Sequence, residues 1–203
     1  MIVEKKHLEN FTILYVEGLI KLGEPGWQWP LARLRDGRAP VISDGVHPKG
    51  DTRFRNGVGH RGDDLMYAKP KVTPKGAPLP RYPWESRGFE VPKQTSALAA
   101  GPGIVTVSRW LPTGYAIAID HGFGVETAYH HLASPLRAKG DYVIAGDAVG
   151  IVGGPPPECN GGKPGLVHLH FDLLIGGKFH DPEPYLRSWP FPAPSPPSPP
   201  PVA

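Results

Sequence analysis

Glycine and proline restrict what this chain can fold into more than any other feature of its sequence. The 203 residues include 26 glycines and 27 prolines, well above the usual frequencies. Both residues destabilise helices and favour turns, so this composition predicts many short strands joined by long loops. We therefore expect an all-β fold, mainly antiparallel, with one core, because the chain is too short for two full enzymatic domains.

Charge and cysteine content exclude several classes of protein. The formal net charge is only +3, and the basic residues form no concentrated block, so nucleic-acid binding is not indicated. A single cysteine, Cys159, excludes an internal disulfide framework and a cysteine-rich zinc module. The apolar run from Phe11 to Val16 is too short for a membrane span or a signal-peptide core, so we expect neither.

Strand-like runs separated by turn residues fill the middle of the chain. Three runs with hairpin punctuation between them predict an antiparallel meander over 97–110, 114–120 and 124–132. Further short strands are expected at 11–16, 18–22, 40–43 and within 140–153. The pattern divides the chain into an N-terminal appendage and loop region (1–50), a main domain (51–189) with a Pro-rich insertion (69–94), and a disordered Pro-rich tail (190–203).

An apolar run over residues 166–175 carries two histidines one residue apart and reads as a strand. Alternate side chains of a strand share a face, so Leu169 and Phe171 are expected in the core while His168 and His170 project together from the other side. Two imidazoles on one rigid surface suggest a metal site. For a lone His-x-His, however, one half-buried and one solvated histidine is the simpler interpretation.

Two other segments could complete such a site. His60 and Asp64 stand four residues apart, and the glycines around them argue against a helix, so we expect a strand kinked at Gly62. Further along, His130 and His131 are adjacent, and in a regular strand they face opposite sides.

Taken together, these segments resemble the lysostaphin-type (LytM-like) zinc endopeptidases that cut peptidoglycan cross-bridges. The resemblance covers about residues 56–187, and an accidental match to every element in order is improbable. The matching elements, in the family's order, are His60-x-Gly-x-Asp64, Asp120-His-Gly-Phe-Gly124, Tyr129-x-His131-Leu132, Gly140-Asp-Tyr-Val-Ile-Ala-Gly146 and Leu169-His-Phe-Asp172. Asp172 replaces the closing Glu of the family. The resemblance implies a lysostaphin/LytM-type barrel-sandwich (duplicated hybrid motif) core.

The resemblance also implies roles for individual residues. His60, Asp64 and His170 would bind one Zn²⁺ per chain, and His131 and His168 would be catalytic histidines without a metal bond. A carboxylate and two imidazoles leave the ion one net positive charge and an open position, which lowers the pKa of a bound water to about 7. The two catalytic histidines could accept a proton and stabilise an oxyanion, and the sequence does not say which does which.

The choice of His131 over His130 follows the family pattern, in which the catalytic histidine precedes Leu132 and shares a face with Tyr129. The remaining candidates are interpreted as structural or surface residues: Asp120 and His121 in the hairpin, Tyr129 in the core or rim, and His7, His47 and His180 on the surface. Cys159 would need a contacting base to act as a nucleophile. The 69–94 insertion is longer than the corresponding connection in the family. We expect it to form a wall of the substrate groove and to determine substrate specificity.

Two alternatives compete with an enzyme. One is a catalytically silent LytM-like module that binds cell wall or regulates a hydrolase, but such proteins lack one or more of the five positions, all of which are filled here. The other is a lipoyl or biotinyl carrier domain, suggested by 140–146, but no lysine occupies a hairpin tip. We therefore predict a monomeric zinc metalloendopeptidase acting on peptidoglycan outside the cytoplasm. Without a visible export signal, we hypothesise a phage- or prophage-encoded lysis or virion-associated enzyme.

Overall fold

The computed structural model describes residues 15–16, 19–20, 26–51, 57, 59–69, 88–153, 159–160, 163–164 and 167–193. Almost all regular structure in these ranges is antiparallel strand, and the helix they contain, α1 (Glu183–Leu186), has four residues. The predicted all-β, antiparallel class is therefore confirmed. No helix in the described part of the chain has the length and hydropathy needed to cross a membrane.

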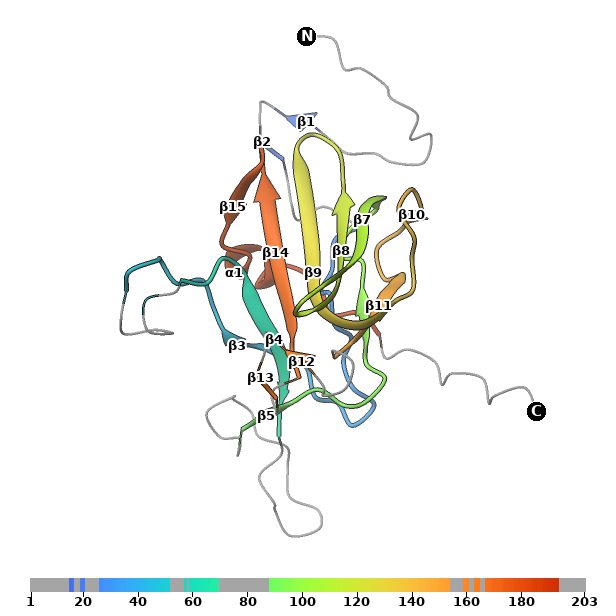
Figure 1. The fold of residues 1–203 in the computed structure, drawn as a ribbon. Helices are drawn as coiled ribbons and strands as arrows, with labels where there is room; N and C mark the ends of the chain where they lie inside the picture. The colour runs from blue at the N-terminus through green and yellow to red at the C-terminus, as the bar shows by residue number, and fades with distance from the viewer. Residues whose placement is uncertain are drawn as a thin grey trace, which may run out of the picture.

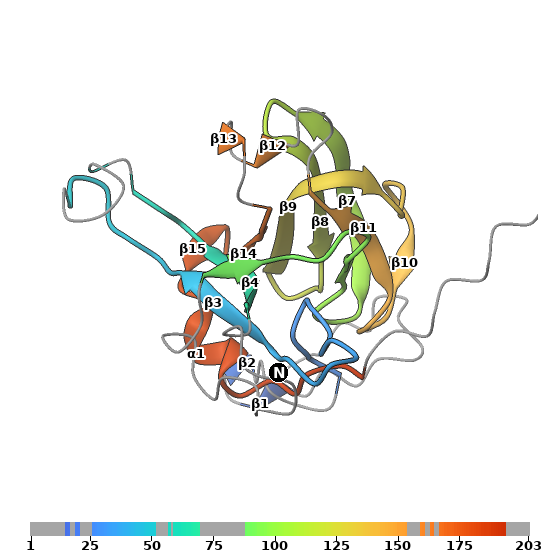
Figure 2. The ribbon, with the colours of Figure 1, turned by 90° about the horizontal axis from the view of Figure 1, so that it is seen from below.

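One eleven-stranded sheet forms the body of the protein (Figure 1). Its main path runs in the order β10-β7-β8-β9-β14-β4-β3, and Figure 2 shows β3 and β4 at one end with β7 and β10 at the other. These strands are β3 (Pro40–Asp44), β4 (Asp63–Ala68), β7 (Gly103–Leu111), β8 (Gly114–Asp120), β9 (Val125–Pro135), β10 (Tyr142–Val143) and β14 (Leu169–Ile175).

Shorter strands extend this sheet at its margins. They are β5 (Phe89–Glu90) on β4, β6 (Ser96–Leu98) on β11, β11 (Ala148–Val152) on β9, and β15 (Lys178–His180) on β14. Two small hairpins lie outside it: β1 (Tyr15–Val16) with β2 (Leu19–Ile20), and β12 (Cys159–Asn160) with β13 (Lys163–Pro164). The C-terminal end of the predicted insertion joins the sheet, because β5 pairs with β4. Residues 70–87 of the insertion lie outside the described residues.

The predicted meander is present in β7, β8 and β9, with one difference. The expected strand 97–110 is two strands, because β6 pairs with β11 whereas β7 pairs with β8. The break falls at Gly101 and Pro102. Proline has no N–H for a ladder, and a Cβ on Gly101 would lie only 2.9 Å from the ring of Trp27. The chain therefore turns at this point instead of continuing straight.

One face of the sheet packs into the core, and the other face is left for a site. Alternate residues of the three central strands are fully buried on the core face: Ile117, Ile119, Tyr129, Leu169, Phe171 and Leu173. Burial of each large side chain contributes about 1.5–3 kcal/mol. The intervening residues of the same strands, including His170, lie on the opposite face.

Segments from both flanks of the predicted main domain complete the core. Trp29, which the sequence places in a loop region, is buried, and its indole N–H donates to the carbonyl of Leu186 at 2.6 Å. Its backbone N–H donates to Pro190 at 3.0 Å, and its ring lies 4.9 Å from that of Phe191. Residues 190–193 of the predicted tail are therefore packed, and 194–203 lie outside the described residues.

Candidate metal centre

Two of the predicted ligands are brought together by strand pairing. In the register of β14 with β4, His170 lies directly opposite Asp64. Cross-strand partners project to the same side of a sheet, so both side chains stand on the face away from the core. β14 begins at Leu169, three residues later than the predicted strand 166–175, and His168 therefore lies just before the strand.

His60 reaches the same place from the chain that leads into β4. Its backbone pairs in both directions with His47, through hydrogen bonds of 2.8 and 2.9 Å. Between His60 and the strand, Gly62 passes so close to β14 that a Cβ would lie 2.3 Å from the carbonyl oxygen of Phe171. Only glycine allows this approach. At the predicted kink, the backbone of Gly62 therefore crosses close to the backbone of β14, and β4 begins only after this crossing.

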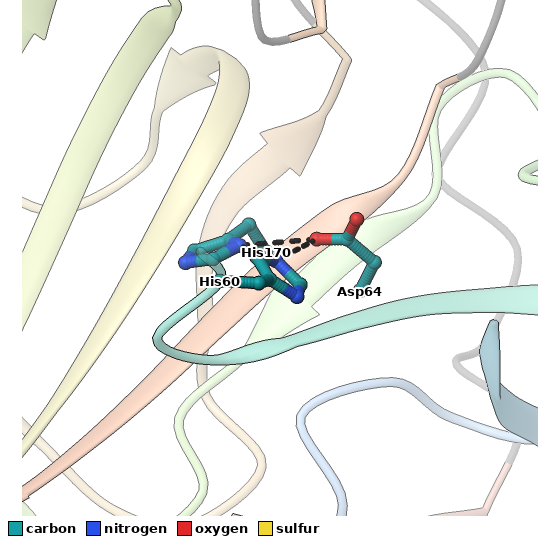
Figure 3. A group of neighbouring side chains, drawn as sticks. All are labelled: His60, Asp64 and His170. Carbon is teal, nitrogen blue, oxygen red and sulfur yellow. Dashed lines mark hydrogen bonds and ion pairs between the residues drawn. The ribbon is translucent and has the colours of Figure 1, made fainter. Parts of the chain in front are cut away.

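The three side chains converge on one point (Figure 3). His60 Nε2 lies 2.9 Å from His170 Nδ1 and 3.1 Å from Asp64 Oδ1, and His170 Nδ1 lies 3.0 Å from the same oxygen. Donors bound at 2.0–2.1 Å to a tetrahedral zinc stand roughly 3.3 Å apart. The three atoms therefore form a triangle of nearly the right size, and two imidazoles with one carboxylate are a donor set that suits zinc.

The tautomer of each ligand histidine is fixed by an acceptor behind it. His60 Nδ1 donates to the carbonyl of Gly45 at 2.6 Å, and His170 Nε2 donates to Asp172 Oδ1 at 3.0 Å. The other nitrogen of each ring therefore faces Asp64. Histidine ligands of metals almost always have such an acceptor, which orients the ring.

Burial and charge act in opposite directions at these groups. Burial alone would raise the pKa of Asp64, but the hydrogen bonds from His170 and His60 outweigh it and hold the pKa well below its usual range. Burial alone would lower the pKa of His170, but Asp172 and Asp64 outweigh it and raise that pKa to about 9. A buried carboxylate of this kind needs a cation beside it.

Two further predicted residues lie beside the triangle. His168 Nε2 is 3.3 Å from Asp64 Oδ1. The ring of His131 is 4.8 Å from that of His168 and 5.8 Å from that of His170. His131 Nδ1 donates to the carbonyl of Thr113 at 3.0 Å, which leaves Nε2 with the lone pair. Burial, followed by the neighbouring His168, lowers the pKa of His131 to about 4, so the ring is neutral near pH 7.

The expectation that His131 shares a strand face with Tyr129, opposite to His130, is wrong. Tyr129 is fully buried on the core side, and its hydroxyl accepts the backbone N–H of Ala100 at 2.7 Å. His131 has a left-handed φ of 62°, and the register of β9 with its neighbours shifts close to this residue. The bulge breaks the alternation, so His130 and His131 both reach the site.

Sequence reasoning missed three other residues near the triangle. His47, expected at the surface, is backbone-paired with His60, and its Nε2 donates to Asp44 Oδ1 at 2.6 Å. The sequence shows Asp172 only as the replacement for the closing Glu of the family pattern, yet in the structure it accepts a hydrogen bond from His170. Asp63 is fully buried with no hydrogen bond to its carboxylate from any described residue, and burial, then Asp181 and Glu183, raise its pKa to about 7.

The other candidates either have a structural or surface position, as predicted, or lie outside the described residues. His121 is buried in the hairpin between β8 and β9, where its Nδ1 donates to the carbonyl of Pro102 at 2.6 Å. His180 is exposed on β15. His7 and the side chain of Cys159 lie outside the described residues.

An antiparallel sheet whose open face gathers a His-Asp-His triangle and further histidines fits the class of metal-dependent peptidases. Comparison with known proteins agrees: the model of peptidase family M23 matches residues 83–182. The chain is therefore similar to this family over about half of its length. The matched segment includes His131, His168 and His170, whereas His60 and Asp64 precede it.

Among curated relatives, the peptidoglycan DD-endopeptidase ShyA of Vibrio cholerae is 32% identical over 97 residues, which are 47% of this chain and 21% of that protein. The murein hydrolase activator EnvC of Escherichia coli is 28% identical over 104 residues, 51% of this chain and 23% of that protein. The aligned segments thus span only about a fifth of the length of these relatives.

Solved structures share the fold. A zinc-containing peptidase from Vibrio cholerae superposes with a TM-score of 0.54 at 22% identity, covering 79% of this chain and 39% of that one. The catalytic domain of lysostaphin from Staphylococcus simulans gives 0.50 at 22% identity, with 74% and 92% covered. The predicted lysostaphin/LytM-type fold is therefore confirmed.

Proposed function

We propose that this protein is a zinc-dependent endopeptidase that hydrolyses peptide cross-links of bacterial peptidoglycan. The observation that carries the proposal is the triangle of His60 Nε2, Asp64 Oδ1 and His170 Nδ1, with edges of 2.9–3.1 Å. The match to the M23 family model supports a peptidase, and the similarity to ShyA, a peptidoglycan DD-endopeptidase, supports a cell-wall substrate. Bound at these three atoms, zinc would supply Lewis acidity for activating water and polarising a peptide carbonyl.

The two histidines beside the triangle are suited to the proton transfers that amide hydrolysis requires. We assign proton acceptance from the attacking water to His131, because its Nε2 lone pair is held ready by the Nδ1 hydrogen bond to Thr113. We assign stabilisation of the developing oxyanion to His168, whose Nε2 lies 3.3 Å from Asp64 Oδ1, beside the triangle. Asp172 keeps His170 in the tautomer that directs Nδ1 to the ion.

Digestion of purified peptidoglycan tests this function. We expect the zinc-loaded chain to release fragments whose masses show hydrolysis of one peptide bond in the cross-link, and chelation to stop the reaction. Mass spectrometry of the fragments also identifies the bond. Intact cross-links after incubation with a fully zinc-loaded chain would refute the proposal.

A second candidate is a silent regulatory module, favoured by the similarity to the murein hydrolase activator EnvC. Metal content together with clearing of cell-wall suspensions separates the two functions. A regulator would clear no cell wall alone but would stimulate a partner hydrolase. The filled set of His60, Asp64 and His170, with His131 and His168 beside it, favours the enzyme.

The proposed substrate places the site of action outside the cytoplasm. Delivery by a phage, either at lysis or on a virion, is our hypothesis for how the enzyme reaches the cell wall. Accumulation of the intact chain in the periplasm when it is expressed alone would contradict that route.

A further inference from the structure

His130 is a histidine of the site that the proposed mechanism does not use. It lies directly opposite His170 in the pairing of β9 with β14, on the sheet face that carries the triangle. The two rings meet edge to face with centroids 5.5 Å apart. Its side chain is 26% exposed, so the ring is accessible from the open side of the sheet.

One nitrogen of His130 is held by a buried carboxylate. Its Nε2 lies 3.1 Å from Asp172 Oδ2, while the other oxygen of Asp172 accepts the proton of His170 Nε2. Asp172 is only 6% exposed, and the hydrogen bonds of the two histidines outweigh its burial and keep its pKa well below the usual range. A charged acceptor held in this way fixes the orientation of the His130 ring.

The second nitrogen of His130 has no such partner. Within the described residues, Nδ1 makes no hydrogen bond, whereas Nδ1 of the adjacent His131 is occupied by Thr113. The bulge at His131 is what brings both neighbours to the site. His130 therefore combines a fixed ring, an open nitrogen and partial exposure beside the metal triangle.

We propose that His130 is a substrate-binding residue, which accepts a hydrogen bond at Nδ1 from a backbone N–H of the substrate peptide. Because Nε2 faces Asp172 as a donor, Nδ1 is the ring nitrogen that remains to accept a hydrogen bond. An extended peptide advances about 3.3 Å per residue, so a ring 5.5 Å from that of His170 contacts the substrate within about two residues of the scissile bond. The inference rests on the proposed function, since it takes a peptidoglycan peptide as ligand.

Binding measured without turnover tests the role. The probe is a purified cross-linked peptide dimer from peptidoglycan, titrated calorimetrically into zinc-loaded protein carrying His168→Ala. Adding His130→Phe keeps the ring shape and removes both nitrogens. Loss of one net hydrogen bond should raise Kd about fivefold to tenfold. The matched control, His180→Phe on the exposed strand β15, should leave Kd unchanged.

Two results would overturn the inference. One is an unchanged Kd in His130→Phe. The other is loss of zinc from that variant, which would mean that His130 acts on His170 through Asp172 and not on the substrate. If His130→Phe does not fold, His130→Leu replaces it, because it also removes both ring nitrogens, and the same increase in Kd is expected.

The proposed function and this inference can fail separately. If the unmodified protein binds the peptide dimer but leaves it intact, the proposed endopeptidase function is refuted. The comparison of Kd values in the His168→Ala background still decides the role of His130. A parent chain that binds no dimer at all overturns both.

Discussion

At the scale of single residues, one backbone angle decides which histidines the site contains. Strand alternation predicts that only one of His130 and His131 can face the metal triangle. The φ of 62° at His131 brings both histidines to the triangle, and the residue types in this segment do not predict that angle. The convergence of His60, Asp64 and His170 was predictable, because it needs only regular pairing and a known motif order.

The roles of the two histidines of the His-x-His pair should separate on mutation. We expect His170→Ala to lose both zinc and hydrolysis, because the triangle loses one of its three corners. We expect His168→Ala to retain zinc at one ion per chain while kcat falls by about 10²–10³-fold, the typical effect of removing one group that stabilises an oxyanion. Metal analysis of both variants checks this. A His168→Ala protein without zinc would show that ligand and catalyst are exchanged.

At the scale of elements, the segment that follows β3 holds a metal-ligand candidate in place. Gly45 supplies the carbonyl that accepts His60 Nδ1–H, and the hydrogen bond from His47 to Asp44 joins the residues on either side of Gly45. This support lies outside the family match, and sequence reasoning placed His47 at the surface. The pairing partner of a loop residue leaves no local signal in the sequence.

Removing the hydrogen bond between His47 and Asp44 should weaken metal binding. We expect Asp44→Ala to raise the Kd for zinc about tenfold, within the 10–100-fold range typical for partners behind metal ligands. The control is Asp36→Ala, which removes a similar contact to Arg38 near the opposite end of β3. Competition with a chromogenic chelator measures both. Equal zinc affinity in Asp44→Ala and Asp36→Ala would contradict this account.

The hairpin between β8 and β9 should make stability depend on pH. Burial lowers the pKa of His121 from 6.5 to about 4, with the carbonyl of Pro102 and the charge of Asp120 opposing that shift. The folded pKa lies below the unfolded one, so the contribution to stability is complete above pH 6.5 and is lost as the pH falls toward 4.

The corresponding measurement is denaturant unfolding between pH 7 and 4. Relative to His121→Gln, the unmodified protein should lose about 1.4 kcal/mol of unfolding free energy per pH unit in that window. Comparison with the variant cancels the other groups that titrate in the same range. Parallel stability curves for the two proteins would show that His121 does not carry the effect.

At the scale of the whole molecule, one sheet serves two purposes: its inner face forms the core, and its outer face carries the site. Glycine and proline content, together with alternating strands, predicted the sheet. They did not predict that Trp29 and Phe191 close the core, because contacts between residues so far apart in sequence depend on the completed fold. The supposed loop and tail regions therefore contribute to packing.

Removing the aromatic ring at residue 191 should destabilise the protein without affecting the metal site. Phe191 is partly buried against the core, so we expect Phe191→Ala to lower the unfolding free energy by about 1–2 kcal/mol, less than for a fully buried phenylalanine. Zinc affinity should stay at the wild-type value. Unaltered stability would mean that residues 190–193 contribute little to the core.

The central claim is that His60, Asp64 and His170 bind one zinc ion and leave it an open position. Anomalous diffraction at the zinc edge from crystals of the zinc-loaded protein tests it most directly. We predict a single peak within about 2.0–2.2 Å of His60 Nε2, Asp64 Oδ1 and His170 Nδ1, with neither His131 nor His168 bonded to it. A peak bonded to either of those histidines, or no peak at the triangle, would contradict the account.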